Sequence, residues 1–483
     1  MKVTLIQPEN PFDIAYASGL LRPLGLHLLA SYLEKNGFAV EILDLRVERH
    51  RAISPARLIQ NNESRLFGIT GFTAARFAVA EMAGCIKQKN PSACVVVGGW
   101  HFAHCARETL ERVPEIDIVV KGMGLSSIVA IASAVDQNEL FAGIPSIAYR
   151  DKGQVVETPE EPFRVNLDEI PFYAGFRAED YNERLRAYPK NIRAMGLFSS
   201  LGCPAKCVFC SRVSKGYYLK DPGKFVDEIA LCMDHYGVEA FNFVDNTFTG
   251  HKNHAIAICR EIISRNIKIK WWCESRVDVP LDILDTMREA GCVAVSAGAE
   301  SGSDPVLAGI SKGITTEKIR KFCEKCNDLG IFVDCFFLFS HPGETKADVH
   351  KTFGLMEELK RYPFIRIGTF QPAMIFPGAE LEAMAQERGI IGKEFSWYEP
   401  YDSALNRRLA QIPNVPLFVD LLAPGELIEL NDRGKRLLLT ARERAARAAG
   451  VILGKVSSRA FLKTRSLYRR MNADLWLGLR RKE

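Results

Sequence analysis

Short apolar runs alternate with helical patterns over about the first 125 residues of the chain. The runs VTLIQP, AVEILDL, LFGITGF, ACVVVGG and DIVVKG have the length and β-branched content of buried strands. Between them, PLGLHLLASYLEKNG has apolar positions at helical spacing and stops at Gly37, and a second helix is predicted from about Ala75 to Lys89. Strands that alternate with helices predict a parallel sheet with helices on both faces.

Five strands in this length are typical of a flavodoxin-like, doubly wound Rossmann-type domain, which we expect over residues 1–140. Between residues 141 and 190, IPSIAYRDKGQVVETP predicts a hairpin, and the proline- and charge-rich stretch after it predicts an irregular linker. From residue 191 to 400 the alternation resumes with six βα-type units and no return strand. This pattern predicts a partial (β/α)6 TIM-like barrel, with functional residues at the carboxyl ends of its strands. Residues 401–483 are expected to be mainly helical.

Composition places the chain among ordinary globular proteins, with 483 residues, 47% hydrophobic and 25% charged. It starts without the apolar segment of a secretory signal and has no apolar run of about 18 residues, so we expect a cytoplasmic protein. The net charge of +5 is uneven, because residues 433–483 contain 15 Lys/Arg against 3 Asp/Glu. This basic region is either a solvated or packing helix or a segment that contacts an anionic membrane surface, and the sequence leaves both open.

Three cysteines in the run SLGCPAKCVFCSR carry the main chemical signal, and they are Cys203, Cys207 and Cys210. Three thiolates can hold three irons of a cubane cluster and leave the fourth iron open to a ligand. The alternatives are a structural zinc site or unrelated core cysteines. Structural zinc sites commonly use four ligands in two paired arms, and no second arm follows at a matching distance. The other ten cysteines are expected to be reduced and buried, as in a reducing compartment.

The C-x3-C-x2-C run resembles the signature of the radical S-adenosylmethionine (radical SAM) superfamily, and the likeness extends over residues 191–375. FVDNTF, WWCESRVD, AGAESGSDPVL and FFLFSHPGET are similar to the family's segments after the second to fifth strands. The resemblance implies a [4Fe-4S] cluster on the three cysteines, which are then the metal ligands and the catalytic centre. It also implies SAM contacts by Phe209, Asp245, Glu274, Arg276, Glu300, Ser301, Pro342 and Gly343. Phe337 and Ser340 stand where this family usually has glycine or small residues.

The first domain resembles the cobalamin-binding domain that precedes many radical SAM modules. LLRPLGLHLLASYLEKNGFAVEILDL, VVVGGWHFAH and IDIVVKGMG carry the likeness, while Met123 and Leu125 lie near an expected glutamate. The motif D-x-H-x-x-G is absent, so the resemblance implies a corrin without that histidine ligand. An alternative is a domain kept as a scaffold after losing cobalamin. The implied contacts come from strand ends, at Thr70, Gly71, Thr73, Gly98, Gly99, His101 and Gly122.

Together the two resemblances imply an enzyme that uses a [4Fe-4S] cluster, SAM and cobalamin to methylate an unactivated carbon of a small-molecule or lipid-like metabolite. An oxidative cyclisation or rearrangement without methyl transfer is the main alternative, and a non-catalytic cobalamin or cluster sensor is another. The partners implied are an electron donor such as flavodoxin or ferredoxin. No RNA-binding barrel is recognised after the radical domain, so no nucleic-acid partner is expected.

Overall fold

The structure is a computed structural model of the chain, and it describes residues 1–9, 21–47, 50, 53–173, 175–181, 193–213 and 216–438. The chain forms two compact units, each described by itself. The first unit contains Met1–Asn182, Ser199–Glu228 and Met374–Leu417, and the second contains Glu183–Phe198, Ile229–Ala373 and Phe418–Glu483. Within the part of the chain that the structure describes, every helix is too short or too polar to cross a bilayer. Most of the basic C-terminal region, from residue 439 on, lies outside the described residues.

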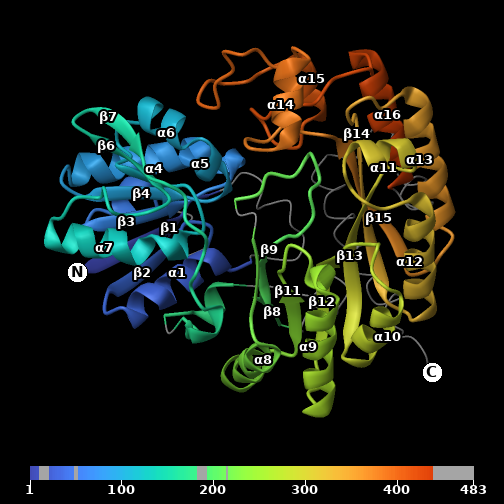
Figure 1. Ribbon diagram of the computed structural model, residues 1–483, viewed down its shortest axis with the longest axis horizontal. Helices are drawn as coiled ribbons and strands as arrows, with labels where there is room; N and C mark the ends of the chain where they lie inside the picture. Colours follow the sequence, from blue (N-terminus) through green and yellow to red (C-terminus); the bar gives the residue numbers. More distant parts are fainter. Residues whose placement is uncertain are drawn as a thin grey trace, which may run out of the picture. The chain divides into compact units, whose positions relative to one another are not determined.

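A seven-stranded sheet organises the first unit (Figure 1). Its strands are β1 (Lys2–Gln7), β2 (Ala39–Asp44), β3 (Leu66–Thr70), β4 (Cys94–Gly98), β5 (Ile118–Val120), β6 (Ile147–Asp151) and β7 (Gln154–Glu157). The first five are parallel in the order β2-β1-β3-β4-β5. This is the flavodoxin-like order, so the expected fold is confirmed.

Helices cover both faces of this sheet, as its buried strands require. They are α1 (Leu24–Lys35), α3 (Pro55–Leu58), α4 (Arg76–Lys89), α5 (Trp100–His104), α6 (Ala106–Arg112) and α7 (Ile128–Gln137). Helices α1 and α7 contact each other. A separate core joins Ile69 and Val97 of the strands to Met82 of α4, Phe102 of α5 and Leu110 of α6.

The predicted hairpin extends this sheet instead of standing in a linker. Strand β6 pairs antiparallel with β5, and β7 pairs with β6. Arg150 of β6 attaches the hairpin to the segment around α6. Its guanidinium donates to the carbonyl oxygens of Val113, at 2.8 Å, and of Leu110 and Ile116. The hairpin thereby covers the edge of β5, which would otherwise expose unpaired backbone groups.

Six parallel strands form the sheet of the second unit, in the order β15-β14-β13-β12-β11-β8. They are β8 (Ala194–Leu197), β11 (Ala240–Phe243), β12 (Lys270–Ser275), β13 (Cys292–Glu300), β14 (Phe332–Phe339) and β15 (Ile365–Pro372). The helices of this part are α8 (Pro222–Tyr236), α9 (Lys252–Ser264), α10 (Asp282–Glu289), α11 (Asp304–Gly309), α12 (Thr316–Asp328), α13 (Lys346–Leu359) and α16 (Pro424–Leu437). The sequential order of six parallel strands confirms the partial barrel expected from the sequence.

Two segments expected within the barrel and the helical region belong to the first unit. One is Ser199–Glu228, in which β9 (Ser200–Gly202) and β10 (Tyr217–Leu219) pair antiparallel. The other is Met374–Leu417, with α14 (Glu380–Glu387) and α15 (Ala404–Leu409). The second segment is held by long-range hydrogen bonds from Arg76 to the carbonyl oxygens of Trp397 and Asn414.

Candidate functional site

The cysteine loop, described over residues 203–213, follows β9, which pairs with β10. Cys203 and Cys207 are half-buried and Cys210 is exposed, whereas eight of the other ten cysteines are buried. Gly202 enters the loop at φ +90°, and a Cβ there would lie 2.2 Å from the carbonyl oxygen of Gly216. The sharp turn at the loop's base therefore requires glycine at position 202.

Backbone contacts hold the loop in place. The Cys210 amide donates to the Cys207 carbonyl at 3.1 Å, and the Ser211 hydroxyl donates to the Pro377 carbonyl at 2.6 Å. Val208 is the buried residue of the loop, and Phe209 is half-buried. Among the described residues, no three His, Cys, Asp or Glu side chains converge tightly enough to hold a single metal ion. Cysteines that each bind a different iron of a cluster need not converge on one point, so the accessible thiols of this loop fit a cluster held at three corners.

The first unit brings the cysteine loop next to the carboxyl edge of the seven-stranded sheet. Leu201 of β9 and Tyr218 of β10 pack on a small core that includes Leu125, just beyond β5. Gly378 lies so close to His104 of α5 that a Cβ there would be 2.2 Å from the His104 Nδ1. The cysteine loop, expected to hold the cluster, and the sheet edge, expected to bind cobalamin, therefore lie in one compact unit.

At this sheet edge the backbone at Gly99 and at Gly71 lies very close to neighbouring atoms. Gly99 has φ +104°, and a Cβ there would lie 2.7 Å from the Gly71 carbonyl oxygen. The Gly71 amide donates to the Gly98 carbonyl at 3.1 Å. A Cβ on Gly71 would come within 2.9 Å of the Phe102 ring. Both glycines are thus required by the packing of the edge itself. A Cβ on Gly98 or Gly122 would make only ordinary contacts, and Thr70 is half-buried at the strand end.

His101 does not lie at the exposed edge. Its ring is fully buried and packs edge-on against Phe102, Trp397 and Tyr398 at centroid distances of 5.1, 5.9 and 6.0 Å. Neither ring nitrogen has a hydrogen-bond partner among the described residues. Burial, with the charge of Arg76, lowers the pKa of His101 to about 3, so the ring is neutral. Thr73, also expected to contact the corrin, is likewise buried, and both contacts stay predictions.

An exposed aromatic side chain at the same edge was missed from the sequence. Phe72 lies two residues beyond β3 and is 54% exposed. It offers apolar surface to a flat macrocycle, so the sheet edge fits a corrin. Its position two residues beyond the end of the LFGIT strand was the available signal.

In the second unit, Glu300 lies at the carboxyl end of β13 and pairs with a lysine that sequence reasoning missed. The Lys312 Nζ donates to the Glu300 Oε1 at 2.7 Å, and the two side chains are 11% and 7% exposed. A Cβ on Gly298 would lie 2.2 Å from the same Oε1 and 2.7 Å from the Lys312 Nζ. The ion pair between Glu300 and Lys312 therefore occupies the space that a side chain at position 298 would fill. Glu300 itself has φ +60°, a left-handed conformation at a register shift in β13.

Three further predicted residues lie at the ends of β11 and β12. Arg276 makes a bidentate ion pair with Asp278, at 2.8 and 2.9 Å, and donates to the Lys312 carbonyl. Asp245 is buried just beyond β11. The Glu274 side chain is accessible to solvent. Many protein atoms nonetheless surround its carboxyl group, and this desolvation raises the pKa of Glu274 to about 7, although the charge of Lys312 opposes the shift. The strand ends thus bring Glu274, Arg276 and Glu300 around Lys312.

The segment after β14 folds back on itself. Ser340 has φ +65°, which explains why glycine is usual at this position, and its hydroxyl donates to the Phe418 carbonyl at 2.5 Å. Phe337, the other departure, is fully buried within the sheet. The Gly343 amide, beyond Pro342, donates to Asp420 at 2.8 Å. Burial raises the pKa of Glu344 to about 8, although the His341 and Ser340 amides donate to it and oppose the shift.

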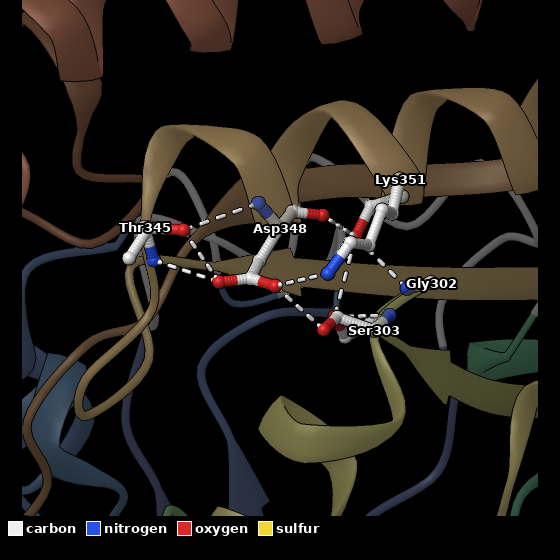
Figure 2. A network of polar contacts seen from close by, with 7 residues as sticks. Gly302, Ser303, Thr345, Asp348 and Lys351 are labelled. Carbon is white, nitrogen blue, oxygen red and sulfur yellow. Dashed lines mark hydrogen bonds and ion pairs between the residues drawn. The ribbon is translucent and has the colours of Figure 1, made fainter.

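Ser301 serves the loop after β13 rather than facing outward. Its hydroxyl lies 3.2 Å from the Thr352 Oγ1, and Thr352 also accepts from the Gly302 amide at 2.8 Å. The Asp348 carboxylate accepts from the hydroxyls of Ser303 and Thr345, at 2.7 and 2.6 Å, and from the Lys351 ammonium at 2.9 Å (Figure 2). The first turns of α13 therefore clamp the loop that carries Glu300.

The Asp348 clamp should make the loop acid-sensitive. Desolvation opposes ionisation, but hydrogen bonds from Thr345, Lys351 and Ser303 outweigh it and hold the Asp348 pKa well below its usual range. A depressed folded pKa gives a stabilisation that is complete above the unfolded pKa of about 4 and declines as the pH falls from there through the folded pKa. We expect Asp348→Asn to lower the free energy of local opening by about 1–2 kcal/mol at pH 7 and by somewhat less at pH 3, where the carboxyl group is protonated in the open loop but still ionised in the closed one. Hydrogen exchange at the Gly302 and Ser303 amides measures this.

The matched control is Asp234→Asn, on the exposed side of α8, which should leave these amides unchanged at both pH values. Equal protection in the Asp348→Asn variant and the native chain at pH 7 would contradict the clamp.

Two family models match the chain. The radical SAM superfamily matches residues 197–356, and the B12 binding domain matches residues 12–132. The chain thus contains a radical SAM domain and a B12-binding domain. Both resemblances inferred from the motifs are thereby confirmed. The cofactors that go with this radical SAM enzyme are a [4Fe-4S] cluster, SAM and cobalamin.

Relatives and solved structures agree with this assignment. The radical SAM enzyme is 29% identical to an uncharacterized methyltransferase of Pyrococcus horikoshii, over 79% of this chain and 82% of that one. It is also 29% identical to the anaerobic magnesium-protoporphyrin IX monomethyl ester cyclase of Rubrivivax gelatinosus, over 74% of this chain and 66% of the cyclase. The radical SAM methyltransferase TsrM of Kitasatospora setae shares the fold, with a TM-score of 0.70, 20% identity and coverage of 89% and 88%.

Proposed function

We propose that the enzyme is a cobalamin-dependent radical SAM methyltransferase that acts on an unactivated carbon of a small-molecule or lipid-like metabolite. The observation that carries the proposal is the first unit, in which the cysteine loop packs beside the carboxyl edge of the B12-binding sheet. The Pyrococcus horikoshii relative, named a methyltransferase, supports it over most of both chains.

When bound, the cluster and SAM supply a carbon-centred radical, and cobalamin supplies a transferable methyl group. The chain's own residues bind and orient these groups. Cys203, Cys207 and Cys210 would hold the cluster, and Glu300 would accept hydrogen bonds from a ribose hydroxyl or ammonium group of SAM. The sheet edge at Thr70, Phe72 and Gly99 would lie against the corrin. An electron would come from a donor such as flavodoxin or ferredoxin.

A second candidate is an oxidative cyclisation with the same cofactors, favoured by the likeness to the Rubrivivax gelatinosus cyclase. The two reactions differ in what happens to the SAM methyl group. Methylation consumes it and releases S-adenosylhomocysteine, whereas cyclisation leaves it on methionine.

The test is anaerobic reconstitution with iron, sulfide and hydroxocobalamin. The enzyme then receives a reductant, SAM with a trideuterated methyl group and a small-molecule cell extract, and mass spectrometry follows the products. We expect retained corrin, 5′-deoxyadenosine, S-adenosylhomocysteine and one metabolite that gains a CD3 group. Formation of 5′-deoxyadenosine without deuterium transfer would support cyclisation, and loss of the corrin would remove cobalamin from the function.

A further inference from the structure

Glu274 belongs to a row of polar residues that crosses four strands of the second sheet in register. Paired residues of neighbouring parallel strands point to the same face. The row consists of Glu274 on β12, Ser296 on β13, Asp334 on β14 and Arg366 on β15. The opposite face is covered by helices, because Cys335, next to Asp334 on β14, lies 3.7 Å from Cys323 of α12 between their sulfur atoms.

The face that carries this row is accessible and partly apolar around Glu274. Trp272, two residues earlier on the same strand, is half-buried, and Val244, the neighbour beyond β11, is 40% exposed. Phe336 and Leu338 of β14 are also half-buried. A carboxyl group thus stands among side chains suited to an organic molecule with an apolar body.

Three cations of this row and its edge each pair with a carboxylate. Lys312 pairs with Glu300, Arg276 pairs with Asp278, and Arg366 makes a bidentate ion pair with Asp334. Among the described residues Glu274 makes neither a hydrogen bond nor an ion pair, and Lys312, whose charge acts on it, pairs with Glu300 at 2.7 Å. The Glu274 carboxylate is therefore open to a cation that a ligand supplies.

An accessible carboxylate that has no ion-pair partner among the described residues can be reached by a ligand that supplies one. This is the arrangement in which a perturbed acid marks a functional site. Resting on the proposed function, we propose that Glu274 binds a protonated nitrogen of the substrate, which is an organic amine whose apolar part lies against Trp272 and Val244.

The pH dependence follows from the groups around this face. Glu274 has a pKa of about 7, so its charge, and with it the binding of an amine, is present above pH 7 and is lost as the pH falls below it. His341 stays neutral because burial lowers its pKa to about 3, while Glu344 titrates near pH 8. The remaining ionisable groups of this edge are Asp245, Arg276, Asp278, Glu300, Lys312, Asp334 and Arg366. Since Glu344 titrates in the same range, only the Glu274→Gln variant isolates the contribution of Glu274.

The experiment compares three probes on the reconstituted full-length enzyme, namely phenethylamine, phenethyl alcohol and phenylacetate. They share a ring and differ in charge, and a primary amine stays protonated below about pH 9. Saturation-transfer NMR titrations at pH 8 and pH 6 give the affinities. We expect phenethylamine to bind at least about tenfold tighter than the other probes at pH 8, with this preference reduced at pH 6 and absent in Glu274→Gln. Glu289→Gln, on the exposed end of α10, is the matched control.

Equal binding of the three probes, no binding of the amine, or a preference that survives Glu274→Gln would overturn the inference. So would a loss of SAM affinity in Glu274→Gln as large as the loss of amine affinity, because Glu274 would then belong to the SAM site. Amine binding by Glu274 and methyl transfer by the enzyme can fail independently. An enzyme that binds the amine but transfers no deuterated methyl group keeps this inference and loses the methyltransferase.

Discussion

Replacing Cys203, Cys207 or Cys210 by alanine is expected to abolish both the iron–sulfur absorption of the reconstituted enzyme and its production of 5′-deoxyadenosine. Each thiolate would bind a different iron, so the loss of one leaves a second iron open and the cluster unstable. The accessible position of these three thiols sets them apart from the buried cysteines. Anaerobic absorption spectra, iron content and product analysis measure the effect.

No other cysteine of the described residues is placed to rescue these variants. Desolvation raises the pKa of Cys94, Cys105 and Cys259 above the ordinary value, which disfavours the thiolate that binds metal. Cys85→Ala, a half-buried cysteine of α4, is the control and should leave the cluster intact. A loop variant that keeps full iron content and SAM cleavage would remove that cysteine from the ligand set.

The two sheets could be predicted from the sequence because several of their strands are apolar throughout and alternate with helical patterns. A strand such as LFGIT or CVVVG shows its burial in its own composition, and helical spacing between strands fixes the parallel connection. The run RAMGLFSSLG predicts one strand where the structure has β8 and β9, and β10 was missed, since three residues carry no usable periodicity.

The sequence could not show which segments pack together over long distances. The role of Met374–Leu417 depends on contacts such as that between the Thr109 and Tyr398 hydroxyls, at 2.8 Å, and no local pattern records a pairing across 289 positions. The burial of His101 has the same cause, because Trp397 and Tyr398 come from that segment.

Within the site, motif residues were predicted but their partners were not. Glu300 was identified from the E-S-G run, whereas Lys312 follows 12 residues later in a loop and is brought back only by the fold. Asp348 did have a local signal, because T-x-x-D at Thr345 is a helix capping box. The role of Ser301 in holding the loop follows from α13, which lies about 50 residues further along the chain.

Glu300→Gln is expected to weaken SAM binding by about 10- to 100-fold, which corresponds to the loss of a charge-assisted hydrogen bond of about 1.5–3 kcal/mol. Glutamine keeps the size of the side chain and one acceptor oxygen, so the fold around Gly298 is retained. What is lost is the negative charge that holds Lys312 and that would attract the ammonium group or accept from a ribose hydroxyl. Isothermal titration with SAM under anaerobic conditions measures the change.

The chain offers a closely matched control in Glu317→Gln. Glu317 also pairs with a lysine, Lys321, at 2.6 Å, but both side chains are exposed on α12, at 72% and 61%. An exposed pair of this kind contributes little, so SAM affinity should be unchanged. Equal SAM affinity in Glu300→Gln and the native enzyme would contradict the assignment of Glu300. Hydrogen exchange at Gly302 separates this from a structural effect, since a variant that only loosens the loop would lose protection there as well as affinity.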